Sequence, residues 1–111
     1  MKSEKYLLID PSGDVSWISI DRVPYKWDPT IEGMNIDQIY SAIDCDCFEQ
    51  VRSTIRNVVM LVDESGKLKR PPKPHNELAS WLYAGWLYGC DDIVGSVILC
   101  ELHLLIRNIN A

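Results

Sequence analysis

Short runs of β-branched and aromatic residues alternate with clusters of turn-forming residues, and this alternation restricts the fold more than any other feature of the chain. The clearest turn clusters are residues 10–14 (DPSGD) and 63–66 (DESG). Asp, Pro, Ser and Gly favour turns, whereas the runs between the clusters favour extended backbone. We therefore predict strands at residues 5–9, 15–20, 48–55, 58–62 and 93–106, the first two forming an antiparallel hairpin.

A helix is predicted between the first two strands and the next two. Asn35 is a suitable N-cap, because its side chain can accept a hydrogen bond from the first helical turn. Ile36, Ile39 and Ile43 then recur at the spacing that puts them on one helical face. We expect this helix to end near Asp44.

A second helix is predicted to begin after Asn76, which we also interpret as an N-cap, and to continue to about Gly85. Its inward-facing residues are expected to be Leu78, Trp81, Leu82 and Trp86.

These elements give the order ββ-α-ββ-α-β and an α+β fold: a mainly antiparallel sheet of about five strands with two short helices packed on one side. Residues 21–34 contain two prolines and one glycine, so we predict an irregular loop there. Hydrophobic residues make up 47% of the 111 residues, enough for one core. We therefore expect a single domain spanning residues 1–111.

The chain is acidic, with a formal net charge of −5, and the excess lies in its first half. Residues 1–49 hold ten acidic and four basic residues, whereas residues 50–111 hold six and seven. This balance argues against nucleic-acid binding and favours either a solvated acidic face or a surface that meets a basic partner. No signal peptide and no membrane-spanning run is recognised, so we predict a cytoplasmic protein.

Catalytic and cofactor motifs are not recognised in the sequence. The most metal-like stretch, residues 44–47 (DCDC), separates its cysteines by one residue and has no matching second pair. The aspartates beside Cys45 and Cys47 would also suppress thiolate formation. We therefore predict no enzymatic activity, no metal and no cofactor.

One loop has the composition of a ligand site. Four cations precede the predicted start of the second helix and could bind a phosphate group near its N-terminus. The same loop contains three prolines, a composition that favours a stiff, solvated connector over a ligand site. The candidate ligand-binding residues are Lys67, Lys69, Arg70, Lys73 and Asn76.

The chain also has more aromatic side chains than one short helix can bury. Residues 81–88 (WLYAGWLY) place them on more than one side of a helix. Exposed Trp and Tyr are favoured at protein interfaces, so we predict a surface that binds a protein partner or a second copy of the chain. Its candidate residues are Trp27, Trp81, Trp86 and Tyr88.

Several short motifs together resemble a known family. They are residues 62–68 (VDESGKL), Pro71, residues 76–79 (NELA) and residues 92–97 (DIVGSV). Within about residues 36–99, the chain is similar to a family of small uncharacterised proteins found in bacteriophages, conjugative elements and the bacteria that carry them. The resemblance implies an α+β fold and a mobile-element setting, and it carries no established activity. This chain departs from the family pattern in residues 21–34 and 81–90.

The predicted function combines these points. We expect a non-enzymatic acidic binding protein from a phage or mobile element, with an accessory or counter-defence role exercised through contacts with another protein. The alternative is a binder of a nucleotide or another phosphate-bearing small ligand through residues 67–76.

Overall fold

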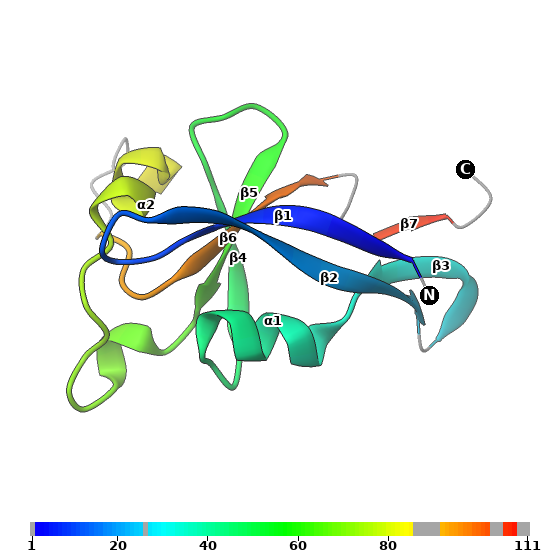
Figure 1. The fold of residues 1–111 in the computed structure, drawn as a ribbon, viewed down its shortest axis with the longest axis horizontal. Coiled ribbons are helices and arrows are strands. Elements are labelled where there is room, and N and C mark those ends of the chain that lie inside the picture. The colour runs from blue at the N-terminus through cyan, green and yellow to red at the C-terminus, as the bar shows by residue number, and fades with distance from the viewer. Residues whose placement is uncertain (1, 26, 86–91, 103–105, 109–111) are drawn as a thin grey trace.

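A sheet in which every strand pair is antiparallel forms the centre of the molecule (Figure 1). The computed structural model describes residues 2–25, 27–85, 92–102 and 106–108. Seven strands are ordered β4-β5-β6-β1-β2-β3-β7. Their bounds are Ser3–Ile9 (β1), Val15–Tyr25 (β2), Asp28–Met34 (β3), Phe48–Arg52 (β4), Val58–Asp63 (β5), Val97–Glu101 (β6) and Ile106–Asn108 (β7). The helices are α1 (Ile36–Ile43), the 3-10 turn η1 (Gly66–Leu68) and α2 (Glu77–Leu82).

The α+β class, the antiparallel sheet and the hairpin of β1 and β2 agree with the sequence prediction, whereas the number and order of strands differ. The first correction concerns residues 21–34, which form the end of β2 and all of β3 rather than an irregular loop. The position of Pro24 in the sheet explains why a proline is tolerated there. Arg22 donates its backbone N–H to the Lys2 carbonyl, just before β1 begins, and Pro24 faces the same side of β2 because alternate residues of a strand point the same way. The N–H that Pro24 lacks would therefore point past the first residue of β1, where that strand offers no partner.

The second correction concerns the predicted long strand at residues 93–106. Gly95 adopts a left-handed conformation with φ 76°, and β6 begins only at Val97. Before that turn, Val94 makes only an isolated bridge to His75. A backbone angle that favours glycine therefore interrupts a run of residues whose composition favours a strand.

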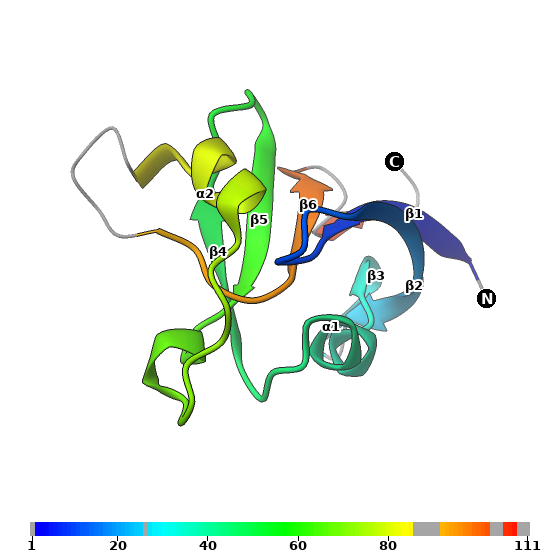
Figure 2. The ribbon, with the colours of Figure 1, turned by 60° about the vertical axis from the view of Figure 1, so that its left-hand side comes forward.

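The third correction concerns the helices, which pack on opposite faces of the sheet rather than on one side (Figure 2). Consecutive residues of β5 point to opposite faces: Leu61 belongs to the cluster that α1 covers, and Met60 and Val62 belong to the cluster that α2 covers. We call these clusters the α1 core and the α2 core. A strand buried on both faces has no polar alternation, as the sequence of β5 shows.

The two predicted N-caps are confirmed. The side chain of Asn35 accepts a hydrogen bond from the Gln38 N–H, and that of Asn76 accepts one from the Ala79 N–H. α2 is shorter than predicted, ending at Leu82. Its inward side consists of Ala79 and Leu82, whereas Trp81 is 69% exposed and Leu78 is also exposed.

Candidate functional site

An apolar groove of about 790 Å³ lies beside the turn that joins β2 and β3. We call it the hairpin groove. It is formed by the end of β2, the end of β3, the start of α1 and the start of β4. Its lining residues are Val23, Pro24, Tyr25, Trp27, Gly33, Met34, Asn35, Ile36, Asp37, Ile39, Phe48 and Gln50.

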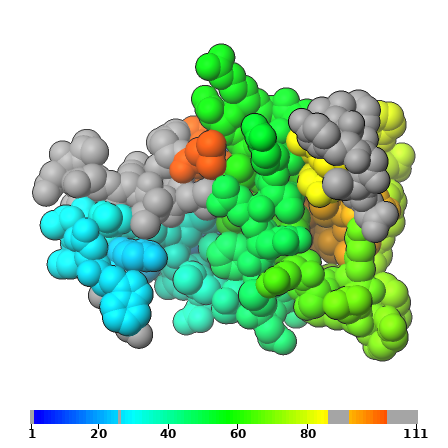
Figure 3. All heavy atoms as spheres, turned by 180° about the vertical axis from the view of Figure 1, so that it is seen from behind, coloured from blue at the N-terminus to red at the C-terminus, as the bar shows by residue number. Residues whose placement is uncertain are grey.

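The groove arises because the β2–β3 hairpin extends beyond β1. Pairing between β1 and β2 runs only as far as Ser3 and Asp21, and Arg22 adds one backbone hydrogen bond to Lys2, so beyond Arg22 the described pairing of β2 is with β3. Figure 3 shows this hairpin, in cyan, projecting from one end of the molecule. α1 begins directly after β3 and packs beneath the overhang. The buried side chains of Met34 and Ile39 form the floor of the groove.

Large apolar side chains at the rim of the groove are exposed. Trp27 is 79% exposed, and Tyr25 and Ile36 are about half exposed. Several exposed apolar side chains beside one recess are typical of an interaction site, whereas single exposed apolar residues are common on any protein surface. Trp27, predicted as an interaction residue, is therefore placed at the edge of a groove that could receive a ligand.

The acidic side chain of Asp37 lines the groove, and Asp28 follows Trp27 in the chain. The hydroxyl of Thr30 donates to the Asp28 carboxylate, as does the Thr30 N–H, and these bonds hold the pKa of Asp28 below its ordinary value. Asp28 is thus ionised at neutral pH. The acidic side chain at the groove favours a cationic ligand.

The basic loop has a different arrangement from the one predicted. Lys69 and Lys73 both contact the buried carboxylate of Asp63, at 2.8 and 2.9 Å. Lys73 also donates to the Ile43 carbonyl, and both lysines donate to the Asp44 carbonyl at the C-terminal end of α1. Cations are favourable at a helix C-terminus, so these lysines stabilise α1 as well as Asp63.

Asp63 depends on those lysines for its charge. Burial by itself would raise the pKa of the carboxyl group, but the hydrogen bonds from Lys69 and Lys73 outweigh burial and bring the pKa to about 2. The side chain of Asp63 is fully buried. This part of the basic loop is therefore a structural ion cluster that joins η1 to α1.

The remaining candidate ligand residues are also placed by the fold. Asn76 is fully buried, and its amide donates to the carbonyls of Ile9 and Gly95 as well as capping α2. Its amide group is therefore engaged in contacts within the fold, and its assignment to a ligand site stays a prediction. Lys67 lies 3.8 Å from Asp92, and Arg70 hydrogen-bonds only neighbouring backbone carbonyls among the contacts described.

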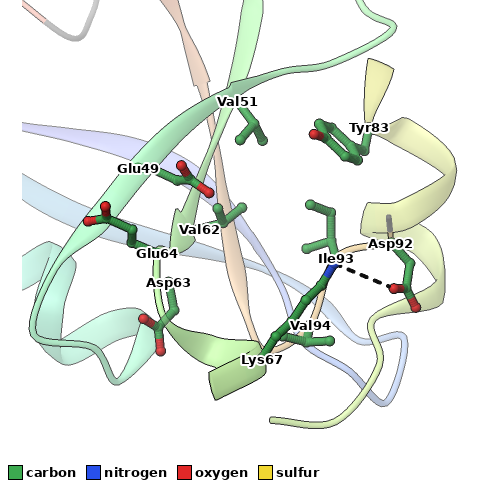
Figure 4. A pocket seen from close by; sticks show the side chains of 10 residues that line it. All are labelled: Glu49, Val51, Val62, Asp63, Glu64, Lys67, Tyr83, Asp92, Ile93 and Val94. Atoms are coloured by element: carbon green, nitrogen blue, oxygen red, sulfur yellow. Dashed lines mark ion pairs between the residues drawn. The ribbon is translucent and has the colours of Figure 1, made fainter. Parts of the chain in front are cut away.

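Two of the motif segments that carry the family resemblance meet around a small pocket of about 150 Å³ (Figure 4). Residues 62–67 approach from one side and residues 92–94 from the other, with the Lys67–Asp92 ion pair across the opening. The contact is close, because a Cβ atom on Gly66 would lie 3.0 Å from Val94. Gly66 therefore allows the close packing of these two segments.

The predicted aromatic residues do not form one surface. Trp81 lies on α2, at the opposite end of the molecule from the β2–β3 turn that holds Trp27 (Figure 1). Trp86 and Tyr88 lie outside the described residues. Trp17, which was not a predicted site residue, is 66% exposed and lines a separate small recess.

The cysteines of residues 44–47 point in different directions. Cys45 is buried in the α1 core, where burial raises the pKa of its thiol. Cys47 is exposed and donates to the Glu64 carboxylate at 2.8 Å, and that bond raises the pKa of Cys47. Within the described part of the chain, no group of three His, Cys, Asp or Glu side chains is arranged to hold a metal ion. Nor does any helix in that part have the length and apolar character needed to cross a membrane.

Most residues of the hairpin groove were not singled out from the sequence. Its lining comes from residues 23–39 together with Phe48 and Gln50, and no local pattern joins these segments. One signal was present in the sequence. Ile36 belongs to the apolar face of α1, but it is the first residue after the N-cap, whereas the buried residues of that face, Ile39 and Ile43, lie further along the helix. Its exposure is a property of the tertiary structure.

Comparison with known proteins gives a family and no activity. A family model described as a domain of unknown function, DUF3846, matches residues 4–103. No curated protein and no solved structure matches the chain. The family match covers nearly all of the sheet and both helices, including the segments that meet in Figure 4. The chain therefore belongs to the DUF3846 family of proteins, which share a domain of unknown function.

Proposed function

We propose that this protein is a non-enzymatic binding protein that holds an apolar, positively charged segment of a partner protein in the hairpin groove. The observation that carries the proposal is the 79% exposure of Trp27 at the edge of an apolar recess. Trp and Tyr supply large contact areas with few rotatable bonds, so they lose little entropy on binding. The Asp37 side chain at the groove, and the acidic first half of the chain, favour a basic partner.

The biological setting of the proposal comes from the sequence motifs. Because they resemble proteins of phages and conjugative elements, the proposed role is that of an accessory or counter-defence factor acting in the cytoplasm on a host protein. The phosphate-binding alternative draws less support from the geometry. Three of its five residues (Lys69, Lys73 and Asn76) already place their polar groups in contacts within the fold.

Three exposed tryptophans allow a matched experiment. The wild-type protein and the Trp27→Ala, Trp17→Ala and Trp81→Ala variants would be used to isolate partners from a lysate of the source organism. The recovered protein would then be purified and titrated against each variant by calorimetry. We expect Trp27→Ala to weaken binding at least tenfold and both controls to change it less than threefold, since only Trp27 borders the groove.

The proposal would be wrong if the three variants bound equally well, or if no purified partner bound the wild-type protein. Because Trp27 is 79% exposed, its replacement is expected to leave the free energy of unfolding within about 0.5 kcal/mol of the wild type. Urea unfolding of each variant checks that condition.

A further inference from the structure

Strand β4 lies at one edge of the sheet. Among the described residues β4 pairs with β5, in a register that places Phe48 opposite Asp63 and Arg52 opposite Val59, and Ser53, directly after β4, makes an isolated bridge to Tyr83 on the other side. A strand edge of this kind presents backbone donors and acceptors that another extended chain can use. The question is which backbone groups face outward and what lies next to them.

The hydrogen bonds identify the outward-facing residues. The Cys47 carbonyl accepts from the Glu64 N–H at 3.1 Å, so Cys47 and the alternate residues that follow it face β5. The intervening residues (Phe48, Gln50 and Arg52) therefore direct their N–H and C=O groups away from the sheet. The next in that series, Thr54, donates its N–H outward to the Leu82 carbonyl at 2.7 Å, which closes this end of the edge.

The open part of this edge adjoins the hairpin groove. The side chains of Phe48 and Gln50 line the groove, while their backbone groups face outward from β4. A chain lying along β4 would thus have backbone partners on one side and an apolar recess within reach of its side chains. The same chain would pass the negative charge of Asp37 at the groove and the positive charge of Arg52 at the closed end.

We infer that the partner segment binds as an extended strand added to the edge of β4. The inference rests on the proposed function and specifies its ligand: a stretch of about five residues in β conformation, matching the length of β4. Alternate apolar side chains of the segment enter the groove, and a Lys or Arg lies beside Asp37. A helical ligand would satisfy its own backbone and leave the outward groups of Phe48 and Gln50 unused.

Charge complementarity favours a foreign segment over a second copy of β4. Two copies of this protein each carry a net charge of −5 and repel each other at long range. A basic segment is attracted by the same field and by Asp37. The occupant we assign to the edge is therefore a basic, apolar strand of another protein, and self-association is one of the outcomes that the test distinguishes.

A pair of substitutions at Gln50 isolates the backbone contribution. Gln50→Pro removes an N–H that faces away from β5, so no bond within the sheet is lost, whereas Gln50→Ala removes only the side chain. The probe is a library of random twelve-residue peptides displayed on yeast and selected for binding to the wild-type protein. Individual peptides would then be titrated against the wild type, both Gln50 variants and Trp27→Ala.

We expect the selected peptides to alternate apolar residues, to contain Lys or Arg, and to bind Gln50→Pro at least tenfold more weakly than Gln50→Ala. Peptides synthesised with N-methyl groups at alternate amides should lose binding to the wild type, a result that does not depend on the folding of Gln50→Pro. Urea unfolding of both variants shows whether the sheet is intact.

Three results would overturn the inference. Peptides that need Trp27 but bind Gln50→Pro and Gln50→Ala equally would place the ligand in the groove without strand addition, and the proposed function would stand. Failure to select any peptide that depends on Trp27 would contradict both proposals. A dimer in light scattering that Gln50→Pro alone converts to a monomer would assign the edge to a second copy of the chain.

Discussion

At the scale of single residues, the buried carboxylate of Asp63 shows how one charge organises a loop. It is held by Lys69 and Lys73, which come from a segment rich in prolines and lysines that gives no sign of a buried partner. The lysines also reach the carbonyls at the end of α1. Removing the carboxylate leaves two cations near a buried site without their counter-ion, and such a loss is costly.

We predict that Asp63→Asn lowers the free energy of unfolding at pH 7 by about 2 kcal/mol. Because the pKa of Asp63 is about 2 in the folded protein and near 4 when unfolded, its contribution is complete above pH 4 and is lost as the pH falls toward 2. Urea unfolding between pH 2 and pH 7 should show the wild type and the variant converging at the acidic end.

The control for this prediction is Asp92→Asn. Asp92 contacts Lys67 and His75, but all three side chains are about half exposed, so the change should cost less than about 0.5 kcal/mol. The assignment of the ion cluster would be contradicted if the difference in the free energy of unfolding between the wild type and Asp63→Asn were the same at every pH.

At the scale of elements, the two helices have the same kind of N-cap in very different surroundings. Asn35 makes one capping bond, to Gln38, at a partly exposed position. Asn76 makes the corresponding bond to Ala79 and also donates to two buried carbonyls, those of Ile9 and Gly95. Asn76 thus joins α2 to the ends of two segments that are distant in the sequence.

We predict that Asn35→Ala costs about 1 kcal/mol and Asn76→Ala about 3 kcal/mol of the free energy of unfolding. The difference arises because Asn76→Ala removes two further buried hydrogen bonds, those to the Ile9 and Gly95 carbonyls, in addition to the cap. Chemical unfolding of the two variants under identical conditions measures both values. Equal losses would show that Asn76 acts only as a helix cap.

At the scale of the whole molecule, the two cores are coupled through one strand. β5 contributes Leu61 to the α1 core and Met60 to the α2 core, and both side chains are fully buried. Loss of packing in either core would expose side chains of β5 and disturb the strand that also supports the other core. We therefore expect the single domain predicted from length and composition to unfold as one unit.

We predict that Met60→Ala and Leu61→Ala each cost about 2–4 kcal/mol and that each shifts a single unfolding transition. Far-UV circular dichroism and tryptophan fluorescence should give coincident curves for both variants. Curves that separate in one variant only would show that the α1 core and the α2 core unfold independently.

Parts of the fold were predictable because their causes are local. The hairpin of β1 and β2 follows from residues 10–14, where Asp10 accepts hydrogen bonds from Ser12 and Asp14 and Gly13 has a positive φ of 95°. The two N-caps likewise depend only on residues within one turn. The prediction for residues 21–34 was wrong because Pro24 lies beyond the part of β2 that pairs with β1, so its missing N–H costs no hydrogen bond to that strand. The extent of that pairing depends on the whole sheet and is not visible in the local sequence.

The candidate site divides in the same way. Trp27 could be named from the sequence because an aromatic excess is visible in composition, but the groove beside it joins β2, β3, α1 and β4 and exists only after the sheet has formed. The basic loop was interpreted as ligand-binding because a sequence shows the charge of Lys69 and Lys73 but not their buried counter-ion.

The sequence by itself determined the α+β class, the turns, the caps and the acidic character of this protein, since each depends on composition or on neighbours along the chain. The tertiary structure alone decided that α1 and α2 cover opposite faces, that Asp63 pairs with Lys69 and Lys73, and that side chains of the edge strand β4 line the groove. These features depend on contacts between distant segments, and such contacts are fixed by the joint packing of the whole sheet rather than by any local preference.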